Sequence, residues 1–561
     1  GLGDVYKRQL LASVAVSLLL AGCAKEQKET LSVIPVPLSA DLQKGAFQLN
    51  DQTKLWIDAP QEDKTRLADY IAGSPFQLDA ALEEVVDNVV ILQQVDRLPD
   101  ITSSEGYVLE VTPKQVKIRA ASGAGLFYGV QTFLQMVNEK KELPVGTVTD
   151  EPRFAYRGMM LDVSRHFFDV NFVKKQIDAF AYYKLNRLHL HLTDAAGWRI
   201  EIDKYPRLTE FAAWREFPTW KEWWNNGRQY SEEGSKNAYG GYYTKEDIRE
   251  LVAYAESRYI TVIPEIEMPA HSEEVLTAYS ELSCTHEPYK QADFCVGNEK
   301  TFEFLENVLT EVMELFPSEY IHIGGDEAGK ASWPTCKLCQ ARMKKEHLTH
   351  EEDLQGYFMK RMCEYVQSKG REVIGWDELT NSTIPDGTII LGWQGMGTAA
   401  LKAAELGHPF IMTPARIMYL IRYQGPQWFE PVTYFGNNTL RNVFDYEPVQ
   451  EDWKPEYTSL LMGVQGSMWT EFCNKPEDVD YLLFPRLAAV AERAWTKPEL
   501  KDWNGFLKGL DVYNSHIAVK GVGYSRSMYN IQHTVTPVDG ALQVNLECIR
   551  PDVEIHYTLD N

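Results

Sequence analysis

Two adjacent acids, Asp326 and Glu327, end the segment of the chain with the strongest chemical signature. Residues 320–323 predict a buried β-strand, and Gly324 and Gly325 allow the backbone to turn immediately before the acids. Because neighbouring residues on a strand point to opposite faces, such a turn is a way to aim both carboxyl groups into one pocket. Carboxylates held close together raise each other's pKa, which suits one of them to carry a proton near neutral pH. The alternative is a helix N-terminus, where acids are favoured without a catalytic role.

Further strand candidates recur along the chain, and each ends in polar or aromatic residues. Helical stretches separate most of them, such as residues 245–258, 300–315, 353–369 and 476–495. Roughly eight strand–helix units over about 340 residues predict a (β/α)8 barrel, an α/β fold whose active site lies at the carboxyl ends of the strands. The strand candidates are residues 156–163, 187–192, 260–264, 320–323, 372–378, 388–394, 409–413 and 460–465.

Motifs at nearly every one of these strand ends resemble glycoside hydrolase family 20. They are RHF at 165–167, HLHLTDAAGWR at 189–199, PEIEMPAH at 264–271, HIGGDE at 322–327, GWDE at 375–378, GWQG at 392–395, and Gln465 with Trp469-Thr470-Glu471. The resemblance spans roughly residues 152–496. It implies a β-N-acetylhexosaminidase with a (β/α)8 TIM-barrel catalytic domain at 151–515, preceded by a small α+β accessory domain at 24–150.

The same resemblance implies a role for each site residue. Glu327 matches the general acid/base, and Asp326 matches the residue that holds the acetamide N–H while the substrate's own acetamide oxygen forms an oxazolinium ion in a retaining reaction. The expected substrate is a glycan with a terminal β-linked N-acetylglucosamine or N-acetylgalactosamine, and neither a cofactor nor a metal is expected. The residues that match sugar-binding or orienting positions are Arg165, Asp194, His271, Trp376, Trp393, Tyr419, Trp469 and Glu471.

The chain departs from the family pattern just after Tyr419. Many members have a Leu and then an Asp that helps to hold the C4 and C6 hydroxyls of the sugar, whereas Ile421 and Arg422 follow Leu420 here. In one interpretation Glu471 alone suffices and Arg422 faces solvent. In the other, the pocket accepts a substituent at C4 or C6, such as an anionic sulfate.

Two other functions fit parts of the sequence. His189 and His191 lie on one strand face, as in barrel metallohydrolases that bind a metal through an HxH motif. The further ligands are limited to His271, His322 and acids, so we expect His189 and His191 to be structural residues of the barrel interior. A non-catalytic glycan-binding protein is the second alternative, but it would require loss of the acid pair, which is present.

Composition and the N-terminal segment bear on partners and location. The chain has 80 acidic and 56 basic residues and a net charge of −24, which argues against a nucleic-acid partner. Residues 10–20 are an apolar run that is too short to span a bilayer and is typical of a signal peptide. Residues 20–23 resemble a bacterial lipoprotein cleavage box. We therefore expect a signal peptide at 1–23, a lipid anchor on Cys23, and a surface-exposed or periplasmic place in the cell envelope.

Three segments leave alternatives open. Cys284 and Cys295 could close a short loop, and Cys336 and Cys339 could form a strained disulfide or half of a metal site. A lone CxxC without a second pair is weak evidence for zinc, so we expect a structural role with reduced thiols. The aromatic-rich insertion at 211–241 forms either a wall beside the barrel mouth or a self-packed flap. Residues 530–561 alternate apolar and polar and predict the start of a β-rich C-terminal accessory module that this sequence truncates. The oligomeric state stays open.

Overall fold

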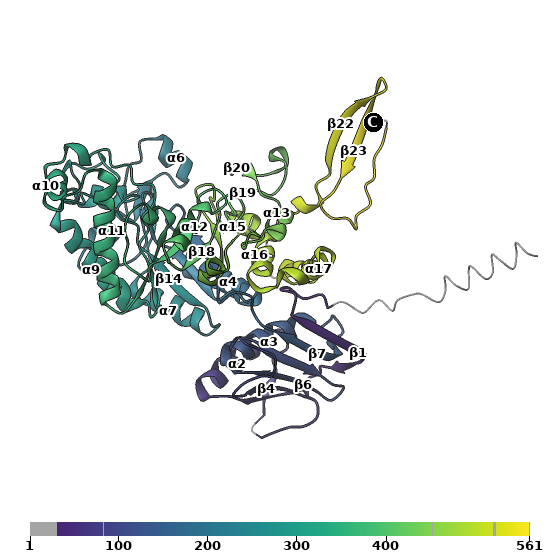
Figure 1. Ribbon diagram of the computed structural model, residues 1–561. Helices are drawn as coiled ribbons and strands as arrows, with labels where there is room; N and C mark the ends of the chain where they lie inside the picture. Colours follow the sequence, from purple (N-terminus) through teal and green to yellow (C-terminus); the bar gives the residue numbers. More distant parts are fainter. Residues whose placement is uncertain (1–30, 82, 452, 520–522, 560–561) are drawn as a thin grey trace, which may run out of the picture.

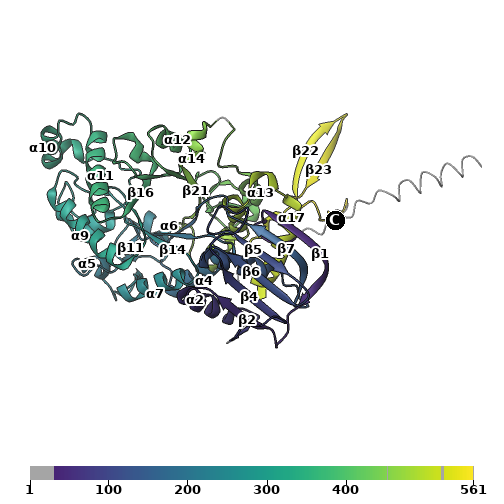
Figure 2. The same cartoon turned by 60° about the horizontal axis from the view of Figure 1, so that its bottom comes forward.

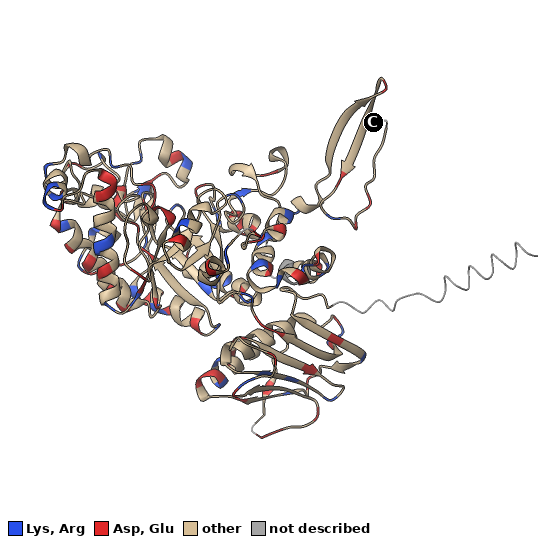
Figure 3. Cartoon of the chain, in the orientation of Figure 1, with Lys and Arg blue, Asp and Glu red and all other residues tan. Residues whose placement is uncertain are grey.

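The computed structural model describes residues 31–81, 83–451, 453–519 and 523–559, so the expected signal peptide and Cys23 lie outside the described residues. A small sheet domain, a closed barrel and a C-terminal hairpin follow one another along the chain (Figure 1). Acidic and basic residues are interspersed along the helices of the barrel and along the small domain (Figure 3). Within the described part of the chain, every helix is too short or too polar to cross a bilayer.

The N-terminal domain is a seven-stranded mixed sheet with the order β1-β7-β5-β6-β4-β2-β3. Buried and partly exposed residues alternate along β5 and β6, because one sheet face packs on helices and the other faces solvent. Helix α3 is buried along almost its whole length, and it lies on the side of the sheet that faces the barrel (Figure 1). The elements are β1 (Ser39–Gln48), β2 (Lys54–Asp58), α2 (Gln61–Ala72), β3 (Asp79–Ala80), β4 (Val89–Gln94), β5 (Tyr107–Val111), β6 (Gln115–Ala120), α3 (Gly123–Met136) and β7 (Glu142–Asp150).

The second domain contains a closed barrel of eight parallel strands, which confirms the predicted fold. Each barrel strand is buried along all or nearly all of its length, as expected when side chains fill the interior and helices cover the outside. Strand β21 pairs with β8 and closes the ring. The strands in barrel order are β8 (Tyr156–Asp162), β9 (Arg187–His191), β14 (Thr261–Glu265), β15 (Tyr320–His322), β16 (Glu372–Trp376), β17 (Ile389–Gly392), β18 (Phe410–Met412) and β21 (Leu461–Met468).

The connections between barrel strands depart from the regular pattern in two places. Between β16 and β17 the chain forms the 3-10 helix η3 (Asp377–Asn381) instead of an α-helix. The single helix expected at 476–495 is wrong, because Pro485 lacks the N–H that a continuous helix needs and divides it into two. The helices around the barrel are α4 (Val170–Tyr182), α7 (Lys245–Glu256), α9 (Glu299–Leu315), α11 (Glu351–Ser368), α12 (Thr398–Glu405), α13 (Leu440–Asp445), α14 (Pro455–Leu460), α15 (Pro476–Leu483), α16 (Arg486–Trp495) and α17 (Trp503–Val519).

Buried ion pairs join the small domain to the barrel. The guanidinium of Arg157, at the start of the first barrel strand, is fully buried and lies 2.8 Å from a carboxylate oxygen of Glu105. Lys184 and Asp150 form a second pair at 3.0 Å, and both side chains are only 1% exposed. Asp150 also accepts a hydrogen bond of 3.0 Å from the indole of Trp495. The two domains therefore share one polar network that is largely buried.

A two-stranded antiparallel hairpin, β22 (Gln532–Val538) and β23 (Ala541–Glu547), follows the last barrel helix. It projects away from the barrel in both views (Figures 1 and 2). Its residues are almost all exposed, so the described part of this segment forms strands, as its alternating sequence predicts, but has little core of its own.

Candidate active site

All eight barrel strands place a predicted site residue at or just beyond their carboxyl ends. Arg165 follows β8, Asp194 follows β9, His271 follows β14, Asp326 and Glu327 follow β15, Trp376 ends β16, Trp393 follows β17, Tyr419 lies in the connection after β18, and Trp469 and Glu471 follow β21. Since parallel strands of a barrel end on the same face, residues scattered over 300 positions converge on one mouth.

The two glycines before the acids are required by the local geometry. Gly324 has a φ of +64°, and a Cβ atom built on it would lie 2.0 Å from Oε2 of Glu267. Gly325 has a φ of +107°, and its Cβ would lie 2.0 Å from a methyl group of Leu379. A side chain at either position would displace the residues that pack beneath the turn. The Gly-Gly pair therefore bends the chain in a space that no larger residue fits.

The turn brings Asp326 and Glu327 to the same histidine. Nε2 of His271 lies 3.4 Å from Oδ2 of Asp326 and 3.4 Å from Oε2 of Glu327. His271 and Glu327 both have left-handed backbone conformations, with φ of +53° and +52°. That conformation is uncommon for residues other than glycine and persists where the surrounding structure holds it, often at functional sites.

The other ring nitrogen of His271 contacts a second carboxylate. Nδ1 lies 3.3 Å from Oδ2 of Asp194, and Nη2 of Arg165 lies 2.6 Å from the same oxygen. Burial lowers the pKa of His271, but the carboxylates of Asp194 and Asp326 outweigh burial and hold this pKa well above its usual range. Burial raises the pKa of Asp194, but Arg165 and His271 hold it well below its usual range. Arg165, His271 and Asp194 are therefore all charged near neutral pH.

Asp326 differs from Glu327 in exposure. The side chain of Asp326 is 13% exposed and that of Glu327 is 57% exposed, so the two acids meet different surroundings. Oδ1 of Asp326 is buried and has no hydrogen-bond partner among the described residues, which leaves an acceptor for a donor from outside the protein. Glu327 instead lines a cavity of about 450 Å³.

Four aromatic side chains form a continuous wall beside the acids. The rings of Trp393 and Tyr419 stack with centroids 6.1 Å apart, Tyr419 meets Trp469 edge to face at 5.6 Å, and Trp469 lies 6.0 Å from Trp376. The guanidinium of Arg165 lies 4.9 Å from the ring of Trp469. The predicted aromatic residues thus adjoin one another and the charged group.

Glu378, the last residue of the GWDE motif, holds this wall in place. Its Oε2 accepts a hydrogen bond of 3.0 Å from the indole of Trp393, and Asp377 accepts one of 2.9 Å from the Trp393 backbone N–H. Burial and the neighbouring carboxylates of Asp326 and Asp377 raise the pKa of Glu378 to about 8. The last two acids of the GWDE motif therefore position Trp393.

Sequence reasoning missed Asp162, the last residue of β8. Its carboxylate accepts hydrogen bonds from the backbone of Arg165 at 3.1 Å and of Thr470 at 3.1 Å, and its Oδ2 lies 3.2 Å from Nη1 of Arg165. Asp162 therefore ties the first and last strands together beneath Arg165. An acid at the last position of a barrel strand is the signal that could have found it.

Glu471 is another acid in this part of the site. Burial raises the pKa of Glu471, and the charge of Arg165 partly offsets this effect.

His189 and His191 belong to a buried cluster below the site. Glu265 accepts hydrogen bonds from Nε2 of His189 at 2.9 Å, from Nδ1 of His191, and from the indole of Trp376 at 2.8 Å. Nδ1 of His322 lies 2.9 Å from the same carboxylate. The carboxylate is thus saturated by protein donors, in accord with the structural role expected for the two histidines.

The side chains of Ile421 and Arg422 are both engaged by other parts of the protein. Ile421 is 1% exposed and belongs to the hydrophobic core. Arg422 donates hydrogen bonds to the backbone oxygens of Ala415 at 2.9 Å and Phe435 at 2.8 Å, and its guanidinium packs on the ring of Tyr434. Its side chain therefore stabilises the 422–437 segment, which disfavours a role in binding an anionic sugar.

The 211–241 insertion combines the two structures that its sequence allowed, a self-packed flap and an aromatic wall beside the barrel mouth. Trp223 is fully buried against Ala196 and Tyr230 and forms a small core of the insertion. Trp220 and Trp224 stack at 4.9 Å and line the same cavity as Glu327. The insertion is therefore a self-packed flap that presents an aromatic wall to the mouth of the barrel.

Comparison with known proteins gives one answer over most of the chain. The model of glycosyl hydrolase family 20, catalytic domain, matches residues 154–498, and that of glycosyl hydrolase family 20, domain 2, matches residues 30–151. A beta-hexosaminidase of Porphyromonas gingivalis is 35% identical over 545 residues, which cover 91% of this chain and 68% of that protein. A beta-hexosaminidase of Vibrio furnissii is 33% identical, with coverages of 87% and 82%.

Solved structures agree. The exo beta-N-acetylglucosaminidase of Vibrio harveyi, solved with N-acetylglucosamine, superposes with a TM-score of 0.78 at 30% identity, covering 89% of this chain and 79% of that one. The beta-N-acetylhexosaminidase of Bacteroides fragilis superposes with a TM-score of 0.76 at 30% identity, covering 88% and 96%. The chain therefore belongs to glycosyl hydrolase family 20 and is a glycoside hydrolase.

Proposed function

We propose that this chain is an exo-acting β-N-acetylhexosaminidase that removes terminal β-linked N-acetylglucosamine or N-acetylgalactosamine with retention of configuration. The observation that carries the proposal is the placement of Asp326 and Glu327 on one strand end, within 3.4 Å of one nitrogen of His271. An ordinary retaining glycosidase places its two carboxyl groups on opposite sides of the scissile bond, about 5–5.5 Å apart. Two acids that share one histidine are better suited to a substrate that supplies its own nucleophile.

In this mechanism the acetamide oxygen of the substrate attacks the anomeric carbon as the glycosidic bond breaks. Glu327 donates its proton to the departing oxygen, and the resulting carboxylate then takes a proton from the water that opens the oxazolinium ion. The exposed carboxyl of Glu327 and the cavity beside it support this role, since the acid must reach the leaving group.

Asp326 accepts the acetamide N–H through its unpartnered buried oxygen and stabilises the positive charge that develops on the ring. The cationic His271 lies beside both acids and is anchored from behind by Asp194, so the site holds its charges in fixed positions before substrate arrives. Such preorganised electrostatics lower the barrier because no reorganisation is needed during the reaction.

The aromatic wall encloses the acetamide group and one face of the sugar. Trp376, Trp393 and Trp469 exclude water that would compete with the internal nucleophile, and the hydroxyl of Tyr419 donates to the acetamide oxygen. Arg165 and Glu471 bind sugar hydroxyls, and the two acids that pair with Arg165 fix its orientation. Trp220 and Trp224 face the leaving-group side, where a further sugar ring can stack.

A pair of chromogenic substrates tests the function. The enzyme should hydrolyse the 4-nitrophenyl β-glycoside of N-acetylglucosamine and leave the matched glucoside, which lacks the acetamide, essentially intact. Efficient cleavage of the glucoside would point to a nucleophile on the enzyme, with Glu267 as the first candidate. Binding of the glycan without hydrolysis of either substrate would instead support the glycan-binding alternative.

The proposed location is the bacterial cell envelope, through a lipid on Cys23. The support is the apolar run at residues 10–20 followed by Leu20-Ala21-Gly22-Cys23. Metabolic labelling with a palmitate analogue in a bacterial host should mark the wild type and not the Cys23→Ser variant. Equal labelling of the two proteins would refute the anchor.

A further inference from the structure

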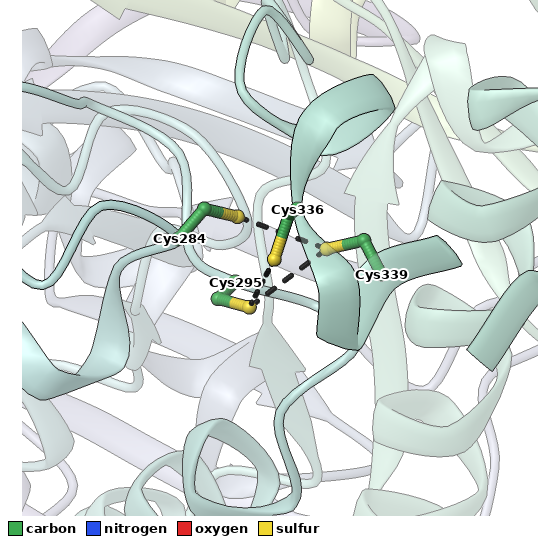
Figure 4. A group of neighbouring side chains, drawn as sticks. All are labelled: Cys284, Cys295, Cys336 and Cys339. Atoms are coloured by element: carbon green, nitrogen blue, oxygen red, sulfur yellow. Dashed lines mark hydrogen bonds between the residues drawn. The ribbon is translucent and has the colours of Figure 1, made fainter. Parts of the chain in front are cut away.

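Four cysteines from two separate loops meet at one point beside the active site (Figure 4). Cys284 and Cys295 lie in the loop between β14 and α9, and Cys336 and Cys339 lie at the start of α10 (Lys337–Lys345), in the loop between β15 and α11. In the sequence, Cys336 and Cys339 look like a CxxC without a second cysteine pair, and the structure shows that this interpretation is wrong. The second pair is Cys284 and Cys295, brought to it by the fold.

The distances between the sulfur atoms fit one bound ion. Cys284 and Cys339 are 3.7 Å apart, Cys295 and Cys336 are 3.6 Å apart, and Cys295 and Cys339 are 3.8 Å apart. A zinc ion with Zn–S bonds of about 2.3 Å at the centre of a tetrahedron sets its sulfurs about 3.8 Å apart. All four ligand atoms lie within 4.8 Å of one another. Disulfide-bonded sulfurs are separated by only about 2.05 Å.

The surroundings of the cluster are built to hold these four sulfurs. Cys295 and Cys339 are fully buried, Cys336 is 8% exposed, and Cys284 is partly exposed. A Cβ atom on Gly297 would lie 2.3 Å from the backbone nitrogen of Cys339, so only glycine lets the two loops approach this closely. The Gly297 N–H also donates to the Cys339 sulfur, as backbone groups around thiolate sites do.

We propose that Cys284, Cys295, Cys336 and Cys339 bind a structural zinc ion as four thiolates. All-sulfur tetrahedral sites select zinc or iron, and four protein ligands that close the coordination sphere are typical of structural zinc. The sequence-based expectation of no metal is replaced by this assignment. The ion has no place in the hydrolytic reaction, because its four ligands leave no position open for water or substrate.

The zinc ion would cross-link the two loops that carry the catalytic residues. His271 precedes the first cysteine pair on one loop, and Asp326 and Glu327 precede the second pair on the other. Between them, Asp293 accepts a hydrogen bond of 2.8 Å from the backbone of Lys330, and the indole of Trp333 donates to the oxygen of Phe294 at 3.0 Å. The same Asp293 lines the cavity beside Glu327. A metal at the cluster would therefore keep the two loops in register.

Metal content of the purified, full-length protein tests the proposal directly. Inductively coupled plasma mass spectrometry should find about one zinc ion per chain. The Cys336→Ser/Cys339→Ser double variant should lose that zinc, while the Cys363→Ala variant, which removes a buried thiol on α11, should keep it. Iron in place of zinc, or zinc that persists in the double variant, would overturn the assignment.

A second measurement keeps the test valid if the double variant fails to fold. Wild-type protein produced with Co²⁺ should show the thiolate-to-cobalt charge transfer and the intense red-region bands of a tetrahedral cobalt–sulfur site. Stepwise addition of a mercurial reagent to the zinc protein should release the ion as thiols are consumed, as read by a metal-sensitive dye. A peptide map without reduction that shows two disulfides among the four cysteines would contradict the zinc site. None of these measurements depends on hydrolytic activity, so the zinc site can be refuted without refuting the proposed function, and the reverse.

Discussion

Nε2 of His271 lies 3.4 Å from Oδ2 of Asp326, and the two residues follow neighbouring barrel strands, β14 and β15. The pKa of His271 is held well above its usual range despite burial, because Asp194 faces one side of the ring and Asp326 the other. A cation therefore stands between Asp326 and Asp194, the acid that anchors Arg165. This arrangement fixes the positions of the charges around His271, and Glu327, with the more exposed carboxyl group, lines the cavity beside them.

Replacing Glu327 by Gln should abolish most hydrolysis of natural glycans and leave binding intact. The amide cannot protonate a leaving oxygen, and general acid catalysis contributes about 10²–10⁴ in rate. A 4-nitrophenyl leaving group needs less protonation, so kcat on that substrate should fall much less. Comparison of kcat and KM on the two substrates is the measurement, and a variant that retains most of its activity on the natural glycan would exclude Glu327 as the acid.

Replacing Asp326 by Asn should slow formation of the oxazolinium ion. The side chain keeps its shape but loses the negative charge beside the developing cation, and removal of one such electrostatic contact costs on the order of 10²–10³ in kcat. Both natural and activated substrates should be affected, unlike with Glu327→Gln. A loss confined to poor leaving groups would assign Asp326 to proton transfer instead.

Gly324→Ala should destabilise the protein and reduce its activity because the new methyl group meets Glu267 at 2.0 Å. The matched control is Gly370→Ala, where φ is +75° and no atom lies within 4 Å of the added Cβ. Both variants incur the left-handed conformation, worth about 1–2 kcal/mol. Only Gly324→Ala adds overpacking, worth about 1–3 kcal/mol. Urea denaturation and kcat/KM measure the difference, and equal losses in both variants would show that contact with Glu267 is unimportant.

Glu378 should make folding stability depend on pH. Its folded-state pKa is raised from 4.5 to about 8, chiefly by burial and then by Asp326, so the folded protein binds more protons than the unfolded chain between these values. Stability should therefore fall as pH rises through this window. In Glu378→Gln the fall should be shallower, while the amide oxygen still accepts from Trp393. Urea midpoints from about pH 5 to about pH 8 test this, and parallel curves for both proteins would contradict it.

Arg422→Ala should leave sugar specificity unchanged. Its Nε and Nη1 already donate to the backbone oxygens of Ala415 and Phe435, and the guanidinium packs on Tyr434, which holds it against the 422–437 segment. The ratio of kcat/KM for plain and 6-sulfated N-acetylglucosaminides should be the same in wild type and variant. If Arg422→Ala lowered kcat/KM for the sulfated substrate and not for the plain one, the anion-binding hypothesis would be supported again.

The barrel and the strand ends that carry the site could be predicted from local sequence rules, whereas the role of each site residue came from the family resemblance. Each strand is a short apolar run, and the residue just beyond its end must lie at the mouth, so Arg165, Asp194 and Trp393 could be placed without knowing their contacts. The HIGGDE turn could be read in the same way, since the two glycines allow both acids to leave the strand direction.

The features that could not be predicted from the sequence depend on contacts between segments that are far apart in the chain. The four cysteines form two pairs that only the fold joins, and Glu378 supports Trp393 from a neighbouring strand end. Arg422 looked like an unmatched charge because the backbone oxygens that bind it have no signature in sequence. The break at Pro485 is the exception, because proline marks it in the sequence itself.

The pairs Arg157–Glu105 and Lys184–Asp150 join the sheet domain to the barrel, with Arg157 and Lys184 almost completely buried. Deleting residues 31–150 would remove Glu105 and Asp150, the carboxylates that pair with these two cations, and would uncover Trp495, on which Tyr128 of α3 packs. A buried charge that loses its partner is strongly destabilising, by about 3–5 kcal/mol. We therefore expect the small domain and the barrel to unfold in a single cooperative transition, and we expect the barrel expressed alone to aggregate.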